Sequence, residues 1–134
     1  MKRLALTTIL LLTVTSLLIS QEAHTNSKKE IELFTTLDNA MMKAETQPVV
    51  LFFYASWCPS CRATKSDIES NFDKLDGMTI LLVDYDKSTD LKRKYGVSYQ
   101  DTFVQINTEG TKISLWNGGK TDGLLRNVIR KESL

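Results

Sequence analysis

The two cysteines of this chain stand three positions apart, in the segment Cys58-Pro59-Ser60-Cys61. An apolar run precedes them and a helical pattern follows, so both side chains are expected on one face of a first helical turn. The unpaired N–H groups and the positive dipole end of such a turn stabilise a thiolate. This environment lowers the pKa of Cys58, which we expect to be the attacking sulfur, charged and reachable. Cys61, one turn deeper, is the expected resolving thiol, and the pair predicts thiol–disulfide exchange through a redox-active disulfide.

Two other uses of the cysteine pair stay open. A disulfide between Cys58 and Cys61 closes a loop of only four residues, and the chain-entropy model gives such a staple about 2 kcal/mol of stabilisation. The pair is also compatible with half of a metal site shared between two chains. Two cysteines and the single His24 do not complete a four-ligand zinc site within one chain. Thiol–disulfide exchange itself needs neither a metal nor an organic cofactor, so for that function we expect none.

The length and net charge of the chain restrict the classes of function that it can have. The 134 residues predict one domain, and a content of 42% hydrophobic and 25% charged residues is ordinary for a globular protein. Lys and Arg number 17 against 16 Asp and Glu, for a net charge of +1. A general nucleic-acid binder needs a clustered basic footprint, which this balance does not indicate. We expect a monomer that binds no nucleic acid.

The start of the chain resembles an export signal. Met1, Lys2 and Arg3 form a short basic head, and no charge follows in residues 4–21. The pattern predicts a signal peptide over residues 1–20 or an uncleaved membrane anchor over residues 4–21. A polar linker over residues 21–30 follows. In both cases the domain over residues 31–134 is expected to be exported, in a periplasmic or extracytoplasmic compartment where thiols can be oxidised.

Helical and strand patterns alternate after the linker. Apolar residues at helical spacing predict helices, and β-branched and aromatic runs predict strands. Strands that alternate with helices indicate parallel pairing, and a closing hairpin adds an antiparallel edge. The expected fold is a mixed four-stranded α/β sheet covered by helices on both faces. The predicted helices are 31–45, 59–75, 89–95 and 122–131, and the predicted strands are 49–54, 78–83, 102–107 and 112–117.

The segment YASWCPSC at residues 54–61 is similar to the active-site segment of the thioredoxin superfamily. KYGV at residues 94–97 resembles the family segment before the next strand. The similarity covers residues 31–132 and looks most like exported bacterial thioredoxin-like proteins. It implies a thioredoxin-like three-layer α/β/α sandwich, with Cys58 as nucleophile and Cys61 as resolving thiol.

The same resemblance implies where substrates bind and what they are. Trp57 would line the substrate surface, together with Pro59, Ser60, Asp101 and Thr102. The partners would be protein thiols or disulfides, with a membrane-bound redox partner. Likeness to exported proteins of cytochrome maturation leaves apocytochrome reduction as a narrower hypothesis.

The chain departs from the family pattern beside the cysteines. The family has a cis-proline before the Thr that begins the next strand, and alignment on residues 95–97 puts Asp101 there, ahead of Thr102. A cis bond at a non-proline residue costs several kcal/mol. The Gln100–Asp101 bond is therefore either trans in an altered loop or a site of stored strain. Asp101 either places a carboxylate near the sulfurs or is a solvated turn residue.

A second departure lies in the predicted core. Phe52 stands where thioredoxins bury an acidic residue, and Leu82 aligns with its usual lysine partner. An apolar pair in place of a buried ion pair can be neutral for stability. It also removes the family's proton acceptor for the second cysteine.

These observations predict an exported thiol–disulfide oxidoreductase, acting as reductant or oxidant. The alternative is a binding module of the same fold with an inert or metal-holding cysteine pair.

Overall fold

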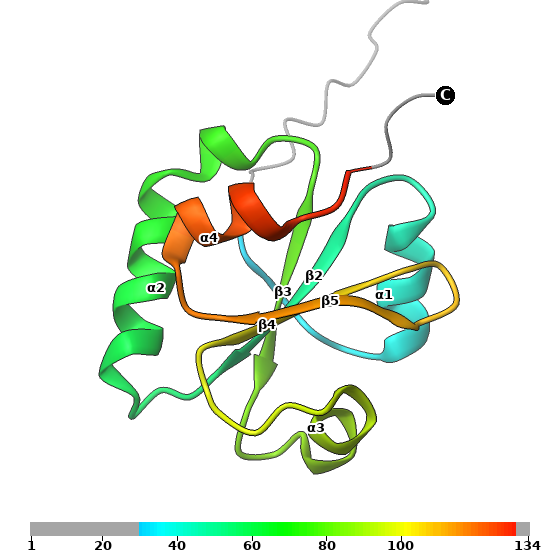
Figure 1. Ribbon diagram of the computed structural model, residues 1–134, viewed down its shortest axis with the longest axis horizontal. Coiled ribbons are helices and arrows are strands. Elements are labelled where there is room, and N and C mark those ends of the chain that lie inside the picture. The colour runs from blue at the N-terminus through cyan, green and yellow to red at the C-terminus, as the bar shows by residue number, and fades with distance from the viewer. Residues whose placement is uncertain (1–29, 131–134) are drawn as a thin grey trace, which may run out of the picture.

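The computed structural model describes residues 30–130 (Figure 1). The predicted signal peptide or anchor and nearly all of the predicted linker fall outside these residues. No helix within residues 30–130 is both long and apolar enough to cross a bilayer.

One mixed sheet organises the domain, with the strand order β1-β3-β2-β4-β5. The first three strands in this order are parallel to one another, whereas β4 is antiparallel to both β2 and β5. The strands are β1 Glu32–Leu33, β2 Val49–Tyr54, β3 Thr79–Asp84, β4 Thr102–Ile106 and β5 Lys112–Asn117. The predicted α/β class is confirmed, although the sheet has five strands rather than the expected four.

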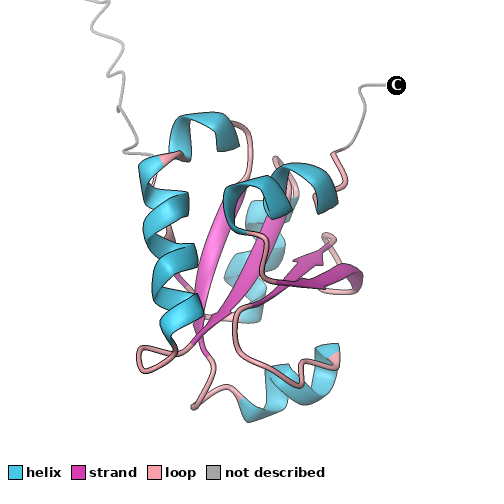
Figure 2. Cartoon of the chain, turned by 60° about the vertical axis from the view of Figure 1, so that its left-hand side comes forward, coloured by secondary structure: helices cyan, strands magenta, loops and turns pink. Residues whose placement is uncertain are grey.

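Helices cover both faces of this sheet (Figures 1 and 2). Buried residues of α1 and α3 pack with one core cluster, and those of α2 and α4 pack with the other. The helices are α1 Leu37–Ala44, α2 Pro59–Ser70, α3 Thr89–Tyr95 and α4 Lys120–Asn127, and a short 3₁₀ helix, η1, spans Phe72–Leu75.

The central strand β2 leads into the segment that carries the two cysteines. Its first five residues are buried, so side chains on both faces enter a core, as expected for a continuous apolar run. Phe52 is paired in register with Leu82 of β3, which confirms that these two residues are neighbours. Phe52 stacks on Phe103 at 4.5 Å between ring centroids, and Phe103 stacks on Trp116 at 5.4 Å. These three rings form a stack that runs across β2, β4 and β5.

The first predicted helix begins later than expected. Residues 31–45 were expected to be helical, but Glu32 and Leu33 form the edge strand β1. Thr36 caps α1 through its side-chain oxygen, which accepts a hydrogen bond from the Asn39 amide at 3.2 Å. The Phe34 amide instead donates to the Leu82 carbonyl at 2.9 Å. The cap and this sheet bond keep residues 32–34 extended.

Two other helices end earlier than their apolar patterns suggest. The predicted helix 59–75 divides at Asn71 into α2 and η1. The predicted helix 122–131 ends at Asn127, and the next residue, Val128, is extended. The Gln105 side chain exchanges two hydrogen bonds with the Ile129 backbone just beyond this end. Leu125 within α4 and Ile129 beyond its end are 45% and 57% exposed.

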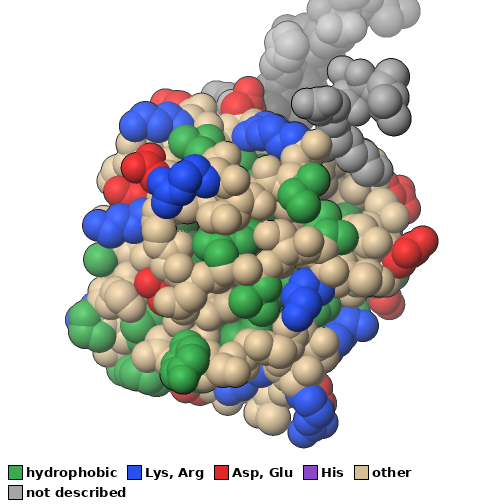
Figure 3. All heavy atoms as spheres, viewed as in Figure 1, with side chains coloured by type: hydrophobic (Ala, Val, Ile, Leu, Met, Phe, Trp, Pro, Cys, Tyr) green, Lys and Arg blue, Asp and Glu red, His purple; other side chains and the backbone are tan. Residues whose placement is uncertain are grey.

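The surface carries no large apolar patch on the side seen in Figure 3. Apolar side chains there lie in separate small groups among polar and charged ones (Figure 3).

Candidate active site

Cys58 is the N-cap of α2. It follows β2 after a short loop, and its amide donates to the Ala55 carbonyl at 3.1 Å. Its own sulfur takes the place that a capping oxygen usually fills, and accepts a hydrogen bond from the Cys61 amide at 3.2 Å. Pro59 occupies the first helical position, where its missing N–H costs nothing. The helix start expected from sequence therefore aims a backbone N–H at the first sulfur.

Three hydrogen bonds act on the Cys58 sulfur. Burial, the largest single influence, raises the pKa of Cys58. Hydrogen bonds from the Cys61 thiol, the Ser60 hydroxyl and the Cys61 amide together outweigh it and lower the pKa below the ordinary value. The Ser60 Oγ lies 3.2 Å from the Cys58 Sγ. The pKa of Cys58 is thus shifted in the direction expected from the helix start.

Cys58 is less accessible than expected. Only 2% of the residue is exposed, whereas its neighbours Trp57, Pro59 and Ser60 are exposed. The sulfur therefore lies just beneath the surface formed by these neighbours. A substrate must approach closely along this surface to reach it.

Cys61 has the opposite character. It is fully buried, and burial together with its hydrogen bond to Cys58 raises its pKa to about 12. Both cysteines are free thiols in this structure. The site thus joins one sulfur whose pKa is lowered to another whose pKa is raised.

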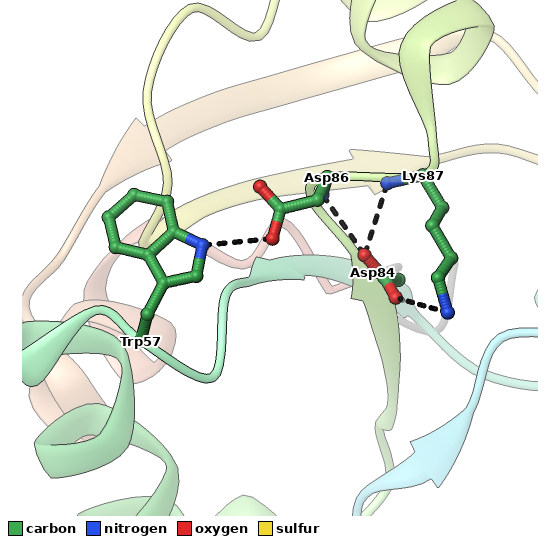
Figure 4. A network of polar contacts seen from close by, with 4 residues as sticks. All are labelled: Trp57, Asp84, Asp86 and Lys87. Carbon is green, nitrogen blue, oxygen red and sulfur yellow. Dashed lines mark hydrogen bonds and ion pairs between the residues drawn. The ribbon is translucent and has the colours of Figure 1, made fainter.

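Trp57 is held from the neighbouring loop (Figure 4). It is 55% exposed, and its Nε1 donates to the Asp86 carboxylate at 2.9 Å. Asp84 fixes this loop, because its Oδ1 accepts the amides of Asp86 and Lys87 at 3.0 and 3.1 Å. The amide of Lys87 is the main cause of the lowered pKa of Asp84. Asp84 and Asp86 are both exposed, and the bond from Trp57 to Asp86 was not found from the sequence.

Asp101 is buried beside the cysteines. It is 7% exposed, and the described residues contain no cis peptide bond, so the Gln100–Asp101 bond is trans. The residue instead adopts a left-handed backbone with φ of 60°, which Asp tolerates better than most residues. Its amide donates to the Phe53 carbonyl at 3.0 Å, and its carbonyl accepts from the Gly118 amide at 2.7 Å. The solvated-turn alternative is therefore wrong.

The Asp101 carboxylate is only partly satisfied. Thr64 donates its hydroxyl to the Oδ2 at 3.3 Å, while the buried Oδ1 has no hydrogen-bond partner among the described residues. Burial raises the pKa of Asp101, against smaller opposing effects of Thr64, Ser60 and Lys120. The negative charge of Asp101 in turn raises the pKa of both cysteines.

The last expected surface residue, Thr102, lies inside. It is 4% exposed, and its hydroxyl donates to the Tyr99 carbonyl at 2.7 Å and accepts from Asn117 at 3.0 Å. Its hydroxyl therefore holds the loop before β4 rather than facing a substrate. Tyr99 in this loop is 72% exposed and was not singled out from the sequence.

Within residues 30–130, no group of three or more His, Cys, Asp or Glu side chains is arranged to hold a metal ion.

Comparisons with known proteins agree with this arrangement. The family model described as thioredoxin matches residues 19–131. Thioredoxin-T of Drosophila melanogaster is 35% identical over 92 residues, which cover 67% of this chain and 57% of the fly protein. Human thioredoxin is 30% identical over 96 residues, covering 72% of this chain and 90% of the human protein. The crystal structure of Malassezia sympodialis thioredoxin matches with a TM-score of 0.61 at 23% identity, covering 73% of this chain and 87% of that one.

Proposed function

Since the chain belongs to the thioredoxin family, we propose that it is an exported thiol–disulfide oxidoreductase that exchanges disulfides with protein substrates through Cys58 and Cys61. The observation that carries this proposal is the contrast between the two sulfurs. Cys58 accepts the Cys61 amide at 3.2 Å and has a lowered pKa, whereas Cys61 is fully buried with a pKa of about 12.

The proposed cycle begins with the Cys58 thiolate. It attacks one sulfur of a substrate disulfide, and the other substrate sulfur leaves with the bonding electron pair. Cys61 then loses its proton and attacks Cys58 in the mixed disulfide, which releases the reduced substrate. The reverse sequence oxidises a substrate dithiol, and the reduction potential of the pair decides which direction prevails.

The exposed side chains around Cys58 are the proposed docking surface for the substrate. Trp57, fixed by Asp86, gives this surface a rigid aromatic plane, and Pro59 and Ser60 adjoin it. A protein disulfide lying across these residues is brought up against the nearly covered sulfur.

The export part of the proposal rests on the basic head and uncharged stretch of residues 1–21. An exported thiol pair needs electrons exchanged across the membrane, so a membrane-bound redox partner completes the proposal. Mass spectrometry of the mature protein from the producing cell, separated into membrane and extracytoplasmic fractions, tests it. Recovery of the chain in the cytosol with Met1 retained contradicts export.

Insulin reduction with dithiothreitol as electron donor tests the enzymatic part. The wild-type protein is expected to accelerate precipitation of the insulin chains. Cys58→Ser is expected to abolish the acceleration, and Cys61→Ser to accumulate a mixed disulfide with substrate. If no disulfide substrate gives turnover that depends on Cys58, the protein is a binding module instead.

A further inference from the structure

The resolving step poses a problem of proton transfer. Cys61 is fully buried and its pKa is about 12, so its thiol does not ionise by itself near neutral pH. Attack on the mixed disulfide requires the thiolate. Phe52 and Leu82, paired in register on β2 and β3, are apolar and offer no acceptor. The proton has to go to another group.

Asp101 lies over the same face of α2 as Cys61. Thr64 follows Cys61 by three positions, so the two side chains project from one side of the helix. Both are buried, and the Thr64 hydroxyl donates to the Asp101 Oδ2 at 3.3 Å. The second carboxylate oxygen, Oδ1, is buried and has no hydrogen-bond partner among the described residues. An unpartnered carboxylate oxygen in such a place is able to receive a proton.

Few charges surround this carboxylate. On the α2 side the titratable groups are the two cysteines, and the charge of Asp101 raises the pKa of both. From α4, Lys120 acts on it in the direction that favours the charged form. β2 and the turn before α4 meet Asp101 through the backbone groups of Phe53 and Gly118. Burial nevertheless raises the pKa of Asp101, which brings a carboxylate closer to the range useful for proton transfer near neutral pH.

We propose that Asp101 is the proton acceptor for Cys61 in the resolving step, a role that rests on the proposed function. The Cys61 proton passes to the Asp101 carboxylate as the Cys61 sulfur bonds to Cys58. The bond between Cys58 and the substrate sulfur breaks, and its electron pair leaves on the substrate as a thiolate. The protonated Asp101 then returns the proton to the departing thiolate or to solvent. No oxidant or reductant beyond the substrate disulfide is required.

A single-turnover reaction distinguishes the step carried out by Cys58 from the step carried out by Cys61. Reduced protein is mixed with dithiobisnitrobenzoate, an aromatic disulfide whose released thiolate is coloured. The first release reports the attack by Cys58, and the second reports closure by Cys61. Because this leaving thiolate needs no proton, the second phase isolates the loss of the proton from Cys61.

Asp101→Asn is the decisive variant. Asn has nearly the same shape and also tolerates a left-handed backbone, so the loop is expected to fold. The second phase should slow by about 100-fold near neutral pH, which is a usual contribution of a general base. The first phase should be at least as fast as in the wild type, because the Asp101 charge raises the pKa of Cys58.

The pH dependence of the second-phase rate distinguishes a proton acceptor from a residue with only a structural role. In the wild type the second phase should rise through the ionisation of a carboxyl group, and Asp101→Asn should lack this inflection. Thr64→Val is the matched control, because it removes a hydrogen bond but keeps the carboxylate. It should retain the inflection and move it to higher pH, since the Thr64 hydrogen bond lowers the pKa of Asp101.

The outcomes are distinguishable. An Asp101→Asn protein that resolves at the wild-type rate at every pH, with a normal first phase, overturns the role of Asp101 and leaves the proposed function standing. A wild-type first phase no faster than that of free cysteine overturns the proposed function itself. The wild-type pH profile tests the proposal independently if the Asn variant does not fold.

Discussion

The backbone amide of Cys61 donates to the sulfur of Cys58 at 3.2 Å, so the proposed resolving residue also stabilises a thiolate at the proposed attacking one. The Cys61 thiol hydrogen bond acts in the same direction on the pKa of Cys58. Burial raises the pKa of Cys61, and the hydrogen bond between the two thiols raises it further. The contrast between their pKa values is therefore a property of the pair.

Alkylation should distinguish the two thiols. Iodoacetamide near neutral pH is expected to modify Cys58 alone in the folded reduced protein, because the Cys61 thiol is buried and its pKa is about 12. Peptide mass spectrometry locates the label. In Cys58→Ser the folded protein should be labelled only very slowly, and rapid labelling should require denaturation. Rapid labelling of Cys61 in the folded variant would show that its burial is incomplete.

Ser60 should tune the attacking sulfur. Ser60→Ala removes the hydroxyl that lies 3.2 Å from the Cys58 Sγ and raises the pKa of Cys58, because that hydrogen bond favours the thiolate. Loss of about 1 kcal/mol corresponds to about a fivefold slower alkylation near neutral pH. The rate profile should shift to higher pH. Ser66→Ala, at an exposed position of α2, is the matched control and should leave the profile unchanged.

Phe52 should be a major contributor to stability. It is fully buried and stacks on Phe103, so Phe52→Ala is expected to lower the free energy of unfolding by about 3–5 kcal/mol. Urea denaturation followed by circular dichroism measures this change. Leu125→Ala, at a residue that is 45% exposed, should cost much less. Equal losses in the two variants would be inconsistent with the packing described here.

Asp67 should stabilise the start of α4. Its Oδ2 accepts the Thr121 amide at 2.9 Å, and this bond is the main cause of the lowered pKa of Asp67. Asp67→Ala should lower the free energy of unfolding by about 1 kcal/mol near neutral pH. Because the folded pKa lies below the unfolded value, this contribution is present above the unfolded pKa and disappears as pH falls through the folded pKa. Denaturation of both proteins at neutral and strongly acidic pH checks that the difference vanishes in acid.

Asp101 should reduce stability above acidic pH. Its folded pKa is raised, so the unfolded chain releases the proton at a lower pH than the folded protein does. As pH rises through the unfolded pKa, the free energy of unfolding of the wild type should therefore fall relative to that of Asp101→Asn. This difference between the two proteins, the gap, should stop growing above the folded pKa. Thermal unfolding across this pH range measures the gap. A gap that is constant with pH would mean that the carboxyl titrates normally in the fold.

The class of fold and the position of the cysteines at the start of a helix could be predicted from the sequence. The apolar run of β2 and the position of Pro59 after Cys58 are strong local signals, and β5 matches its predicted range. The beginning of α1 and the end of α4 were missed because distant groups decide them. β1 forms only by pairing with β3, and the end of α4 depends on Gln105.

The surroundings of the cysteines were harder to predict. Alignment placed Asp101 near the sulfurs, but its trans peptide and left-handed backbone follow from sheet and turn contacts of its own backbone. The bond between Trp57 and Asp86 joins residues 29 positions apart and has no local signature. The small exposed fraction of Cys58 is likewise a product of tertiary packing, which sequence spacing does not report.

The central position of β2 has a practical consequence. Because α2 follows the middle strand of the sheet after only a short loop, we expect its opening to disturb the strands on either side. The Cys61 thiol, fully enclosed at this junction, is therefore a natural reporter of rare large-scale opening. In a protein whose Cys58 has been replaced by serine, slow trapping of this one thiol would measure the spontaneous unfolding frequency of the whole domain without any added denaturant.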